Sequence, residues 1–409
     1  MNLTCLLLAS LLTATTFAAD WPQWHGPNRD NSSTETGLLA AWPAGEPPLA
    51  WKINDIGAGY SGVSIAKGKI YTMGDIGADA FVIALDFNTG KKLWQTRIGK
   101  AGECGNYYGP RATPTVDGDF LYSLAQFGDL SCIQASTGKE VWHKNLKTDF
   151  NGKMMSMWGY SESVLVDGEK VLCMPGGSDG TVIALNKKTG ALVWRSKELT
   201  DSATYSSLLP IVINGVRQVI VYTDAHVAGV AIDTGKLLWS GARAGKVAVI
   251  PMPIYKDNHV FVSSGYGIGC NFFKIAGNKA TEVYANTDMV NHHGGVILLG
   301  EHLYGFNDKG KGAGVWTCME FKSGKVVWSE DKLGKGTLSY ADGHFYLRAE
   351  KGPGTIVLIE ATPSGWKEKG RFDQPDRSKK QSWPHMVISH GKLFVRDQEV
   401  LLCYDIRKK

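Results

Sequence analysis

Residues 82–94 read Val82-Ile83-Ala84-Leu85-Asp86-Phe87-Asn88-Thr89-Gly90-Lys91-Lys92-Leu93-Trp94. The stretch predicts a β-hairpin, because an apolar run leads into a turn whose glycine tolerates a positive φ, and a second short run ends on a tryptophan. Related text recurs as Cys132 to Trp142, Ala184 to Trp194, Ala231 to Trp239 with two residues fewer, and Cys318 to Trp328. A hairpin that recurs in this way indicates a fold made of repeated sheets.

The composition limits what the repeated hairpin can build. With 409 residues, of which 43% are hydrophobic and 20% charged, the chain can bury a large core and does not have a disordered composition. Its 49 glycines and 15 prolines, together with many β-branched and aromatic residues, favour short strands and tight turns, so we expect an all-β protein. The formal net charge of +5 is small for this length, which argues against a nucleic-acid partner.

The spacing of the units predicts the architecture. The aromatic residues that end each unit lie 38 to 52 residues apart, at Trp51, Trp94, Trp142, Trp194, Trp239, Tyr284, Trp328 and Trp366. Each interval provides four strands, as a propeller blade requires. The last unit ends at Val400 to Tyr404 without a fourth strand, and Leu49 to Lys52 resembles a fourth strand without its partners. We therefore predict one domain over residues 49–409, an eight-bladed β-propeller of four-stranded antiparallel blades whose ring is closed by the N-terminal strand.

The N-terminus resembles an export signal. An apolar run from Leu3 to Leu12, with small residues at Thr16 and Ala18, predicts a cleaved signal peptide of residues 1–18 that is too short to span a membrane. We expect the mature protein to be a soluble monomer in the periplasm or outside the cell, and not membrane-spanning. Residues 19–48 are rich in Pro, Gly, Asn and Ser, and we expect them to form an extended arm over the surface, held down by tryptophans.

The cysteines indicate buried core positions. Three of them, Cys132, Cys318 and Cys403, occupy the repeat position of Ala84 and Ala184, which favours small core residues over disulfide pairing. No Cys-x-x-Cys is present, so the sequence does not support a cysteine zinc site, thioredoxin-type redox chemistry or covalently attached haem.

Candidate site residues come from the segments that precede the innermost strands, because these segments converge at one mouth of a propeller channel. They are unusually polar, and we single out as ligand-binding candidates Tyr60, Arg111, Tyr160, Glu162, Tyr205, His292, His293 and His385.

Each of these candidates also has a structural interpretation. The tyrosines could fill the channel, with their hydroxyls hydrogen-bonded to backbone groups. Arg111 could form a buried ion pair with Glu162. We expect at most one of His292 and His293 to face the channel, since adjacent strand residues point to opposite faces. A metal site would need His385 or Glu162 to join a histidine, and we predict no metal.

Two loops contain further motifs. Residues 145–158 include Met154, Met155 and Met157, whose thioethers could bind copper(I), but an apolar lid over the channel mouth is the better interpretation. Gly265-Tyr266-Gly267-Ile268-Gly269 is not followed by a helix, so we predict a turn or strand bend and not a phosphate-binding loop.

The text Ala84-Leu85-Asp86-x-x-Thr89-Gly90-Lys91-x-x-Trp94 resembles the tryptophan-docking repeat of the pyrroloquinoline quinone (PQQ) propellers, over essentially all of residues 49–406. The resemblance implies an eight-bladed propeller in which each tryptophan packs against the next blade. That family includes alcohol dehydrogenases and the propeller lipoprotein of the outer-membrane β-barrel assembly machinery, so the resemblance leaves the activity open.

Two functions follow from this resemblance. A PQQ-dependent alcohol dehydrogenase would stack PQQ in the channel beside a calcium ion, with Glu162, Asn291 and Asp397 as possible calcium ligands. The chain lacks the adjacent cysteine pair of many such enzymes and is shorter than the larger ones, and no lipidated cysteine follows the predicted cleavage site. We therefore favour an exported ligand- or protein-binding scaffold, whose partner is a small-molecule ligand or an envelope protein. The dehydrogenase is the alternative, and its catalytic residues are unknown.

Overall fold

The computed structural model describes residues 20–310 and 314–408, and the predicted signal peptide, residues 1–18, lies outside them. The regular structure of the described residues consists of strands, which confirms the all-β prediction. Over these residues no helix has the length and apolar character needed to cross a membrane.

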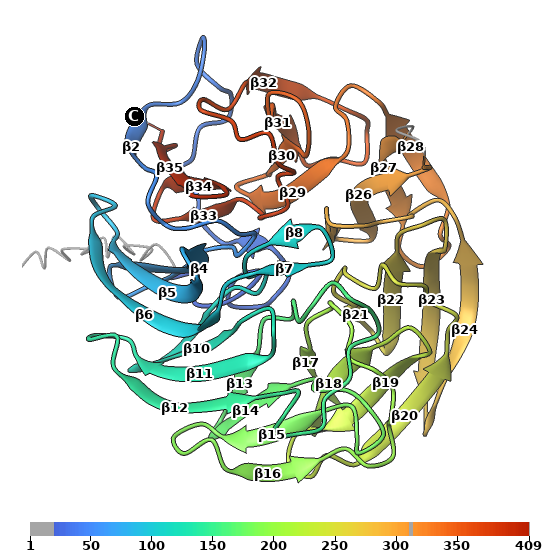
Figure 1. The fold of residues 1–409 in the computed structure, drawn as a ribbon. Helices are drawn as coiled ribbons and strands as arrows, with labels where there is room; N and C mark the ends of the chain where they lie inside the picture. The colour runs from blue at the N-terminus through green and yellow to red at the C-terminus, as the bar shows by residue number, and fades with distance from the viewer. Residues whose placement is uncertain (1–19, 311–313, 409) are drawn as a thin grey trace, which may run out of the picture.

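Apart from β1, β7 and β8, the described strands form eight sets of four that follow one another around a central axis, so the chain is a β-propeller (Figure 1). The first four sets are β3 (Ser64–Ala66), β4 (Lys69–Ile76), β5 (Asp79–Asp86) and β6 (Lys92–Lys100); β9 (Thr115–Asp117), β10 (Phe120–Leu124), β11 (Asp129–Gln134) and β12 (Glu140–Asn145); β13 (Leu165–Asp167), β14 (Lys170–Cys173), β15 (Ile183–Asn186) and β16 (Leu192–Arg195); and β17 (Leu209–Ile213), β18 (Val216–Tyr222), β19 (His226–Ala231) and β20 (Leu237–Ala242). The other four sets are β21 (Ile254–Lys256), β22 (His259–Ser264), β23 (Gly269–Ala276) and β24 (Lys279–Asn286); β25 (Val296–Leu299), β26 (His302–Asp308), β27 (Gly314–Glu320) and β28 (Val326–Glu330); β29 (Gly336–Ala341), β30 (His344–Ala349), β31 (Ile356–Glu360) and β32 (Glu368–Phe372); and β33 (Val387–Ser389), β34 (Lys392–Asp397) and β35 (Val400–Asp405) with β2 (Leu49–Ile53). The fourth and fifth sets are joined by one parallel bridge, between Ser240 and Lys279.

The ring closes by pairing the two ends of the chain, as the sequence predicts. Trp51 of β2 lies opposite Cys403 of β35, and Lys52 lies opposite Leu402, in antiparallel register. In Figure 1 the blue and red ends of the colour range therefore lie side by side. This pairing removes the free sheet edges that an open stack of blades would expose.

The repeated text forms the hairpin between the third and fourth strands of a set. One carboxylate oxygen of Asp86 accepts hydrogen bonds from the backbone N–H groups of Asn88 and Thr89, at 3.1 and 2.9 Å, and from the Thr89 hydroxyl at 2.7 Å. These bonds hold the turn that places Gly90 at a φ of 71°. The tryptophan pairs with the small residue that begins the motif, as Ala84 with Trp94 and Ala184 with Trp194, and a β-bulge follows at once.

The copy that ends at Trp239 was interpreted wrongly from the sequence. Trp239 pairs with Gly229 and not with Ala231, so this copy has full length and its first residue is a glycine. A Cβ atom at Gly229 would collide with the Trp239 indole, which explains why glycine replaces the alanine of other copies.

Several tryptophans dock on the following blade. The Trp142 indole donates to the carbonyl of Lys187 at 3.0 Å, and a Cβ atom on Gly190 would lie 2.8 Å from its ring. Trp51, Trp194 and Trp328 make the equivalent bond at 2.9 to 3.3 Å. The contact between neighbouring blades thus requires a residue without a side chain beneath the indole.

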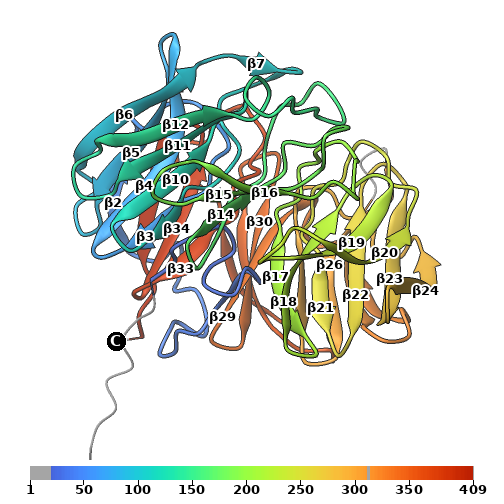
Figure 2. The same ribbon diagram turned by 90° about the horizontal axis from the view of Figure 1, so that it is seen from below.

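The first part of the N-terminal arm, residues 20–33, does not lie over the surface as expected, whereas most of residues 34–48 are exposed. Trp21, His25, Arg29 and Asn31 are buried, and Figure 2 shows this blue segment between the blades at the end of the ring opposite β7 (Glu103–Cys104). Its strand β1 (Ser32–Ser33) adds to β29 in parallel. Buried backbone carbonyls near the channel need hydrogen-bond donors, and side chains of the arm supply them, which explains why this part of the arm is buried.

The cysteines that follow the predicted signal peptide are free and buried, in agreement with core positions.

Candidate functional site

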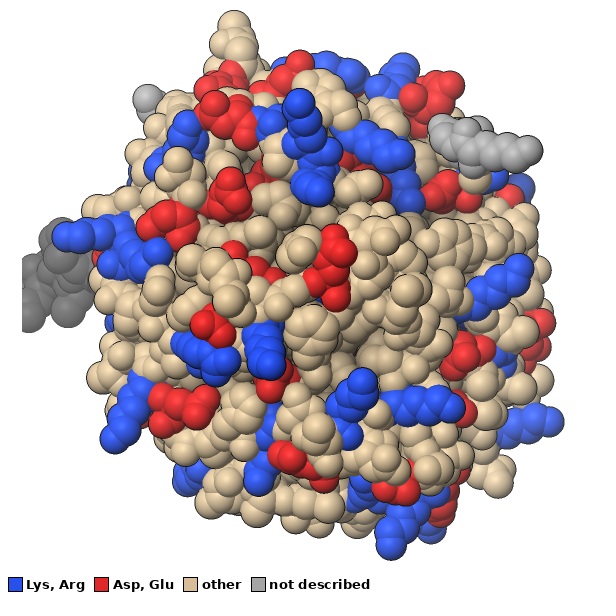
Figure 3. All heavy atoms as spheres, viewed as in Figure 1, with Lys and Arg blue, Asp and Glu red and all other residues tan. Residues whose placement is uncertain are grey.

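A cavity of about 280 Å³ opens at the mouth of the channel that carries the hairpin of β7 and β8 (Tyr107–Tyr108). Figure 3 shows this face, on which acidic and basic side chains lie among uncharged residues around the centre of the ring. Side chains from most of the blades and one from the arm line the cavity: Trp24, Tyr60, Tyr107, Arg111, Trp158, Ser161, Ser163, Tyr205, Ser207, Val247, Ala248, Ile250, Tyr266, His292, His293, Glu350, Lys351, Gln381 and Trp383.

One wall of the cavity is an aromatic stack. The Trp383 ring lies between those of His293 and Tyr60, with centroids 4.0 and 4.5 Å away. The Tyr107 ring lies edge-on to the same indole, with centroids 4.5 Å apart and an interplanar angle of 61°, and it also packs on Trp158 at 5.6 Å. Mutual packing holds these rings in place before any ligand arrives.

His292 presents a defined hydrogen-bond donor. Lys335 Nζ lies 2.8 Å from His292 Nδ1 and 2.8 Å from an Asp308 carboxylate oxygen. An ammonium can only donate, so Nδ1 accepts and the proton of the neutral ring lies on Nε2. Burial, followed by the Lys335 charge, lowers the pKa of His292 to about 3, so the ring is uncharged at neutral pH.

His293 lies beside His292 in the same cavity, with ring centroids 3.8 Å apart. The expectation that at most one of the two would face the channel was wrong, because residues 292–294 form bends and not a strand. His293 Nδ1 is buried without a hydrogen-bond partner among the described residues.

A chain of hydrogen bonds connects this wall with the arm. His385 Nε2 donates to the His293 carbonyl at 2.8 Å, so His385 Nδ1 is the acceptor for His25 Nε2 at 3.2 Å and Asn31 Nδ2 at 3.0 Å. Burial lowers the pKa of His385 to about 4 and that of His25 well below its usual value.

The arm forms the floor of the cavity. Trp24 lines the cavity and stacks on His25 with centroids 4.1 Å apart. Beneath it, Arg29 donates to the carbonyls of Ser163 at 2.6 Å and Val164 at 3.3 Å. Trp24 and the buried Arg29 thus place the arm on one side of the cavity.

Glu162 lies behind the cavity wall and not in it. One of its carboxylate oxygens accepts the Met174 backbone N–H at 2.5 Å, and the other is buried without a partner in the described chain. Burial raises the pKa of Glu162 to about 8, although the positive charge of Arg29 opposes this shift. Across the described residues Glu162 makes no ion pair with Arg111, so the suggested buried pair is not formed.

Arg111 holds the β7–β8 hairpin at the mouth. Its guanidinium donates to the carbonyls of Gly109 and Tyr107 at 2.8 Å and of Cys104 at 3.0 Å. These bonds position Tyr107 over the cavity and occupy most of the donors of Arg111.

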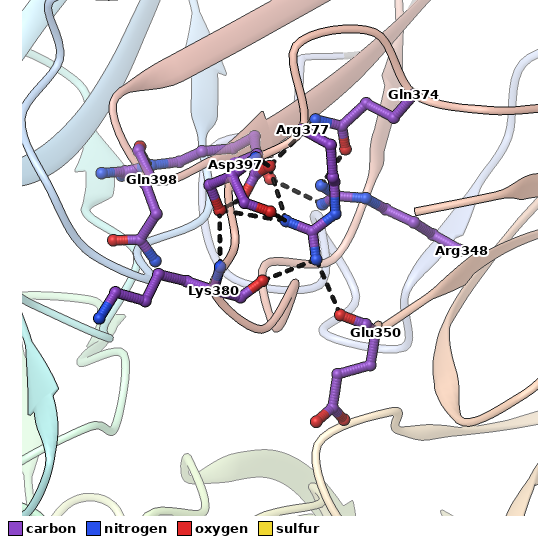
Figure 4. A network of polar contacts seen from close by, with 9 residues as sticks. Arg348, Glu350, Gln374, Arg377, Lys380, Asp397 and Gln398 are labelled. Carbon is purple, nitrogen blue, oxygen red and sulfur yellow. Dashed lines mark hydrogen bonds and ion pairs between the residues drawn. The ribbon is translucent and has the colours of Figure 1, made fainter. Parts of the chain in front are cut away.

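A buried polar network holds the segment that carries Gln381 and Trp383 (Figure 4). Asp397 accepts hydrogen bonds from Arg377 at 2.7 Å and from the backbone N–H and hydroxyl of Ser378 at 2.6 Å. Arg377 also donates to the Glu350 carbonyl at 2.9 Å. In Figure 4 the Glu350 carboxylate points away from this network, and it lines the cavity.

Five of the predicted residues come together in the cavity, and three do not. Tyr60, Arg111, Tyr205, His292 and His293 line it. Tyr160, Glu162 and His385 lie behind the wall, where the Tyr160 hydroxyl donates to the Pro175 carbonyl at 3.1 Å. The structural interpretation of a channel tyrosine thus applies to Tyr160.

The suggested calcium ligands lie in separate surroundings. Asp397 is engaged by Arg377 and Ser378, Glu162 by the Met174 N–H, and the Asn291 amide donates to the carbonyls of Gly295 and Phe306. None of the three lines the cavity. This donor set does not fit a calcium ion beside a ligand in the channel.

Other site residues were missed because they lie on loops without a repeat. Tyr266 belongs to the glycine-rich turn after β22, and Trp158 ends the methionine loop. Met154 and Met155 pack on different core clusters and Met157 is exposed, so the thioethers do not gather as a copper site. Aromatic residues in otherwise polar blade loops are the signal that could have identified the missed residues.

Comparisons with known proteins agree with this fold. The family model described as "Outer membrane protein assembly factor BamB" matches residues 78–330, which is more than half of the chain. The relatives include that assembly factor from Moranella endobia (strain PCIT), 25% identical over 57% of this chain and 56% of the relative. Quinohemoprotein alcohol dehydrogenase ADH IIB from Pseudomonas putida is 30% identical over 33% of this chain and 20% of the relative. The chain spans about half the length of the first of these relatives.

Solved structures show the same architecture at low identity. Quinohemoprotein alcohol dehydrogenase from Comamonas testosteroni aligns with a TM-score of 0.66 and 14% identity, over 95% of this chain and 81% of that chain. BamB from Moraxella catarrhalis aligns with a TM-score of 0.56 and 13% identity, over 84% and 99%. These alignments support the propeller fold alone.

Proposed function

Because the chain belongs to the family of PQQ-repeat propellers described as outer membrane protein assembly factor BamB, we propose that it is an exported, monomeric binding module of the cell envelope. It holds a ligand in the aromatic cavity at the channel mouth and performs no chemistry on it. The observation that carries the proposal is the cavity itself, which aromatic and polar side chains from the blades line together with Trp24 of the arm.

The cavity has the features of a preformed ligand site. Its volume of about 280 Å³ is close to the lower end of the range for small-molecule pockets, ~300–1,000 Å³. The stacked rings of Tyr60, Trp383 and His293 already have the arrangement that a ligand would meet. A preformed site loses little conformational entropy when the ligand binds.

Docking of an envelope protein on the same mouth is a second candidate. Tyr108, Met157 and Tyr266 are exposed apolar residues; Tyr266 lines the cavity, and Tyr108 and Met157 are next in sequence to the lining residues Tyr107 and Trp158. Relatives named as an outer membrane assembly factor support a protein partner. Replacing Tyr108 and Met157 by serine would then weaken capture of the partner while the cavity still binds small probes.

The PQQ-dependent dehydrogenase has weaker support. Among the described residues, the only carboxylate that lines the cavity belongs to Glu350, and the oxygen ligands suggested for calcium lie elsewhere. A titration with PQQ and CaCl₂, followed by absorbance and a dye-linked alcohol oxidation assay, tests this alternative. Saturable PQQ binding with turnover would replace the binding-module proposal.

The binding proposal itself is tested with a neutral aromatic fluorescent probe, N-phenyl-1-naphthylamine. We expect one saturable site, weakened about 10-fold or more by Trp158→Ala, because stacking on an indole contributes on the order of 1 kcal/mol beyond the buried area. Trp366→Ala is the control, since Trp366 packs on a core cluster and does not line the cavity. Equal affinity of the probe for the wild type and Trp158→Ala would contradict the proposal.

A further inference from the structure

The polar side chains of the cavity indicate the kind of ligand it accepts. Tyr107, Tyr266, Lys351 and Gln381 line it with hydroxyl, ammonium and amide groups that have no hydrogen-bond partner within the described part of the chain. The Glu350 carboxylate lies beside them, and its nearest cation is Lys335 at 3.9 Å. The unused groups include donors, acceptors and hydroxyls that can be either. A purely apolar ligand would bury these groups without partners, which is costly.

The charges of the lining disfavour an ionic ligand. Arg111 and Lys351 are positive and Glu350 is an acid, so an anion would meet the carboxylate and a cation would meet the two basic groups. Arg111 already donates to three backbone carbonyls, which leaves it unsuited to clamp a carboxylate. The hydroxyl groups of a neutral ligand can donate to the carboxylate and accept from the basic groups, and such a ligand meets no like charge.

The aromatic walls add a second requirement. Trp24, Trp158 and Tyr266 offer rings to a cavity that is too small for a protein domain. Flat aromatic surfaces pack well against a ring whose faces are apolar C–H groups, whereas the hydroxyls at the edge of that ring reach the polar groups. Saccharides combine both features in one molecule.

We propose that the cavity binds a short neutral saccharide, with its ring faces against Trp158 and Tyr266 and its hydroxyls on Glu350 and Gln381. This assignment rests on the proposed function, because it names the ligand class of the same site. His292 adds a fixed donor, since Lys335 holds its Nδ1 as an acceptor and leaves the proton on Nε2.

The test is competition with the bound fluorescent probe, supported by calorimetry. Cellobiose and N,N′-diacetylchitobiose are titrated against the full chain, with benzyl alcohol, benzoate and phenylalanine as aromatic ligands without a set of hydroxyls. We expect a saccharide to displace the probe and the aromatic compounds to displace it weakly. Glu350→Gln should weaken saccharide binding about 10-fold or more, because it replaces a charged hydrogen bond by a neutral one.

Two controls separate recognition from folding. Glu169→Gln removes an exposed acid that pairs only with Lys187 and Lys188, and it should leave saccharide binding unchanged. Tyr266→Phe keeps the ring and should weaken binding less than Tyr266→Ala. Equal saccharide affinity in the wild type and Glu350→Gln would overturn the assignment.

The outcomes also separate this inference from the proposed function. If benzyl alcohol or phenylalanine displaces the probe and no saccharide does, the ligand class is wrong while the binding module stands. If the probe itself does not depend on Trp158, both proposals fail.

Discussion

His25 Nε2 lies 3.2 Å from His385 Nδ1, although 360 residues separate the two in the chain. This contact makes the N-terminal arm part of the channel wall, because His385 also donates to the carbonyl of His293 in the cavity. Buried histidines therefore connect the arm with the wall of the cavity.

The first prediction concerns acid pH. Burial lowers the pKa of His385 from 6.5 to about 4 and that of His292 to about 3, and it lowers those of His25 and His293 as well. Between pH 6.5 and 4 the unfolded chain binds more protons than the folded chain at these sites, so the folded state loses stability as the pH falls. Urea unfolding at pH 7.5 and pH 5 should show this loss, and His385→Gln should reduce it. His302→Gln is the control. If His385→Gln loses as much unfolding free energy between pH 7.5 and pH 5 as this control does, the prediction is contradicted.

The second prediction concerns Glu162, for which the sign is opposite. Burial raises its pKa from 4.5 to about 8, so between these values the folded chain holds a proton that the unfolded chain has released. The stabilisation is complete below pH 4.5 and is lost as the pH rises through 8. Glu162→Gln cannot ionise, and we expect it to exceed the wild type in stability by about 1–3 kcal/mol at pH 9 but not at pH 5. Thermal unfolding at the two pH values measures the difference; a larger gain at pH 5 would disprove the assignment.

The third prediction concerns the arm. Arg29→Ala removes donors from the buried carbonyls of Ser163 and Val164 and from the Gln23 side chain. We expect a loss of about 2–4 kcal/mol in the free energy of unfolding and faster proteolysis before residue 49. Arg371→Ala is the matched control, because Arg371 forms an exposed pair with Glu368. Equal effects of the two variants would show that the arm does not support the channel.

The fourth prediction isolates tryptophan docking. Gly190 has a φ of 69°, and a Cβ atom there would lie 2.8 Å from the Trp142 ring. Gly168, in the same blade, has a φ of 58° with nothing within 4 Å of its Cβ position. Gly168→Ala should therefore cost ~1 kcal/mol from backbone strain alone. Gly190→Ala should cost ~2–4 kcal/mol, because it also displaces the indole. Chemical denaturation of both variants measures the gap, and similar losses would exclude a docking contribution.

Much of the fold could be predicted from the sequence because its determinants are local and repeated. The Asp86 turn is held by hydrogen bonds to residues only two and three positions away, and the bulge after Ala84 recurs after Ala184. The closing strand was recognisable because Leu49 to Lys52 lacked the neighbours that its pattern requires. The site could be predicted less well, since Trp158, Tyr266 and Trp383 lie on loops that follow no period.

By itself, the sequence determined the hairpins, the tryptophan docking and the pairing of Trp51 with Cys403, because each follows from short-range patterns and from the need to leave no sheet edge unpaired. Only the tertiary structure decided that the arm fills the channel, that His292 and His293 face the same cavity, and that Glu162 stands behind its wall beside Arg29. These outcomes depend on which buried carbonyls need a donor once the ring has closed, and that need arises between residues more than a hundred positions apart.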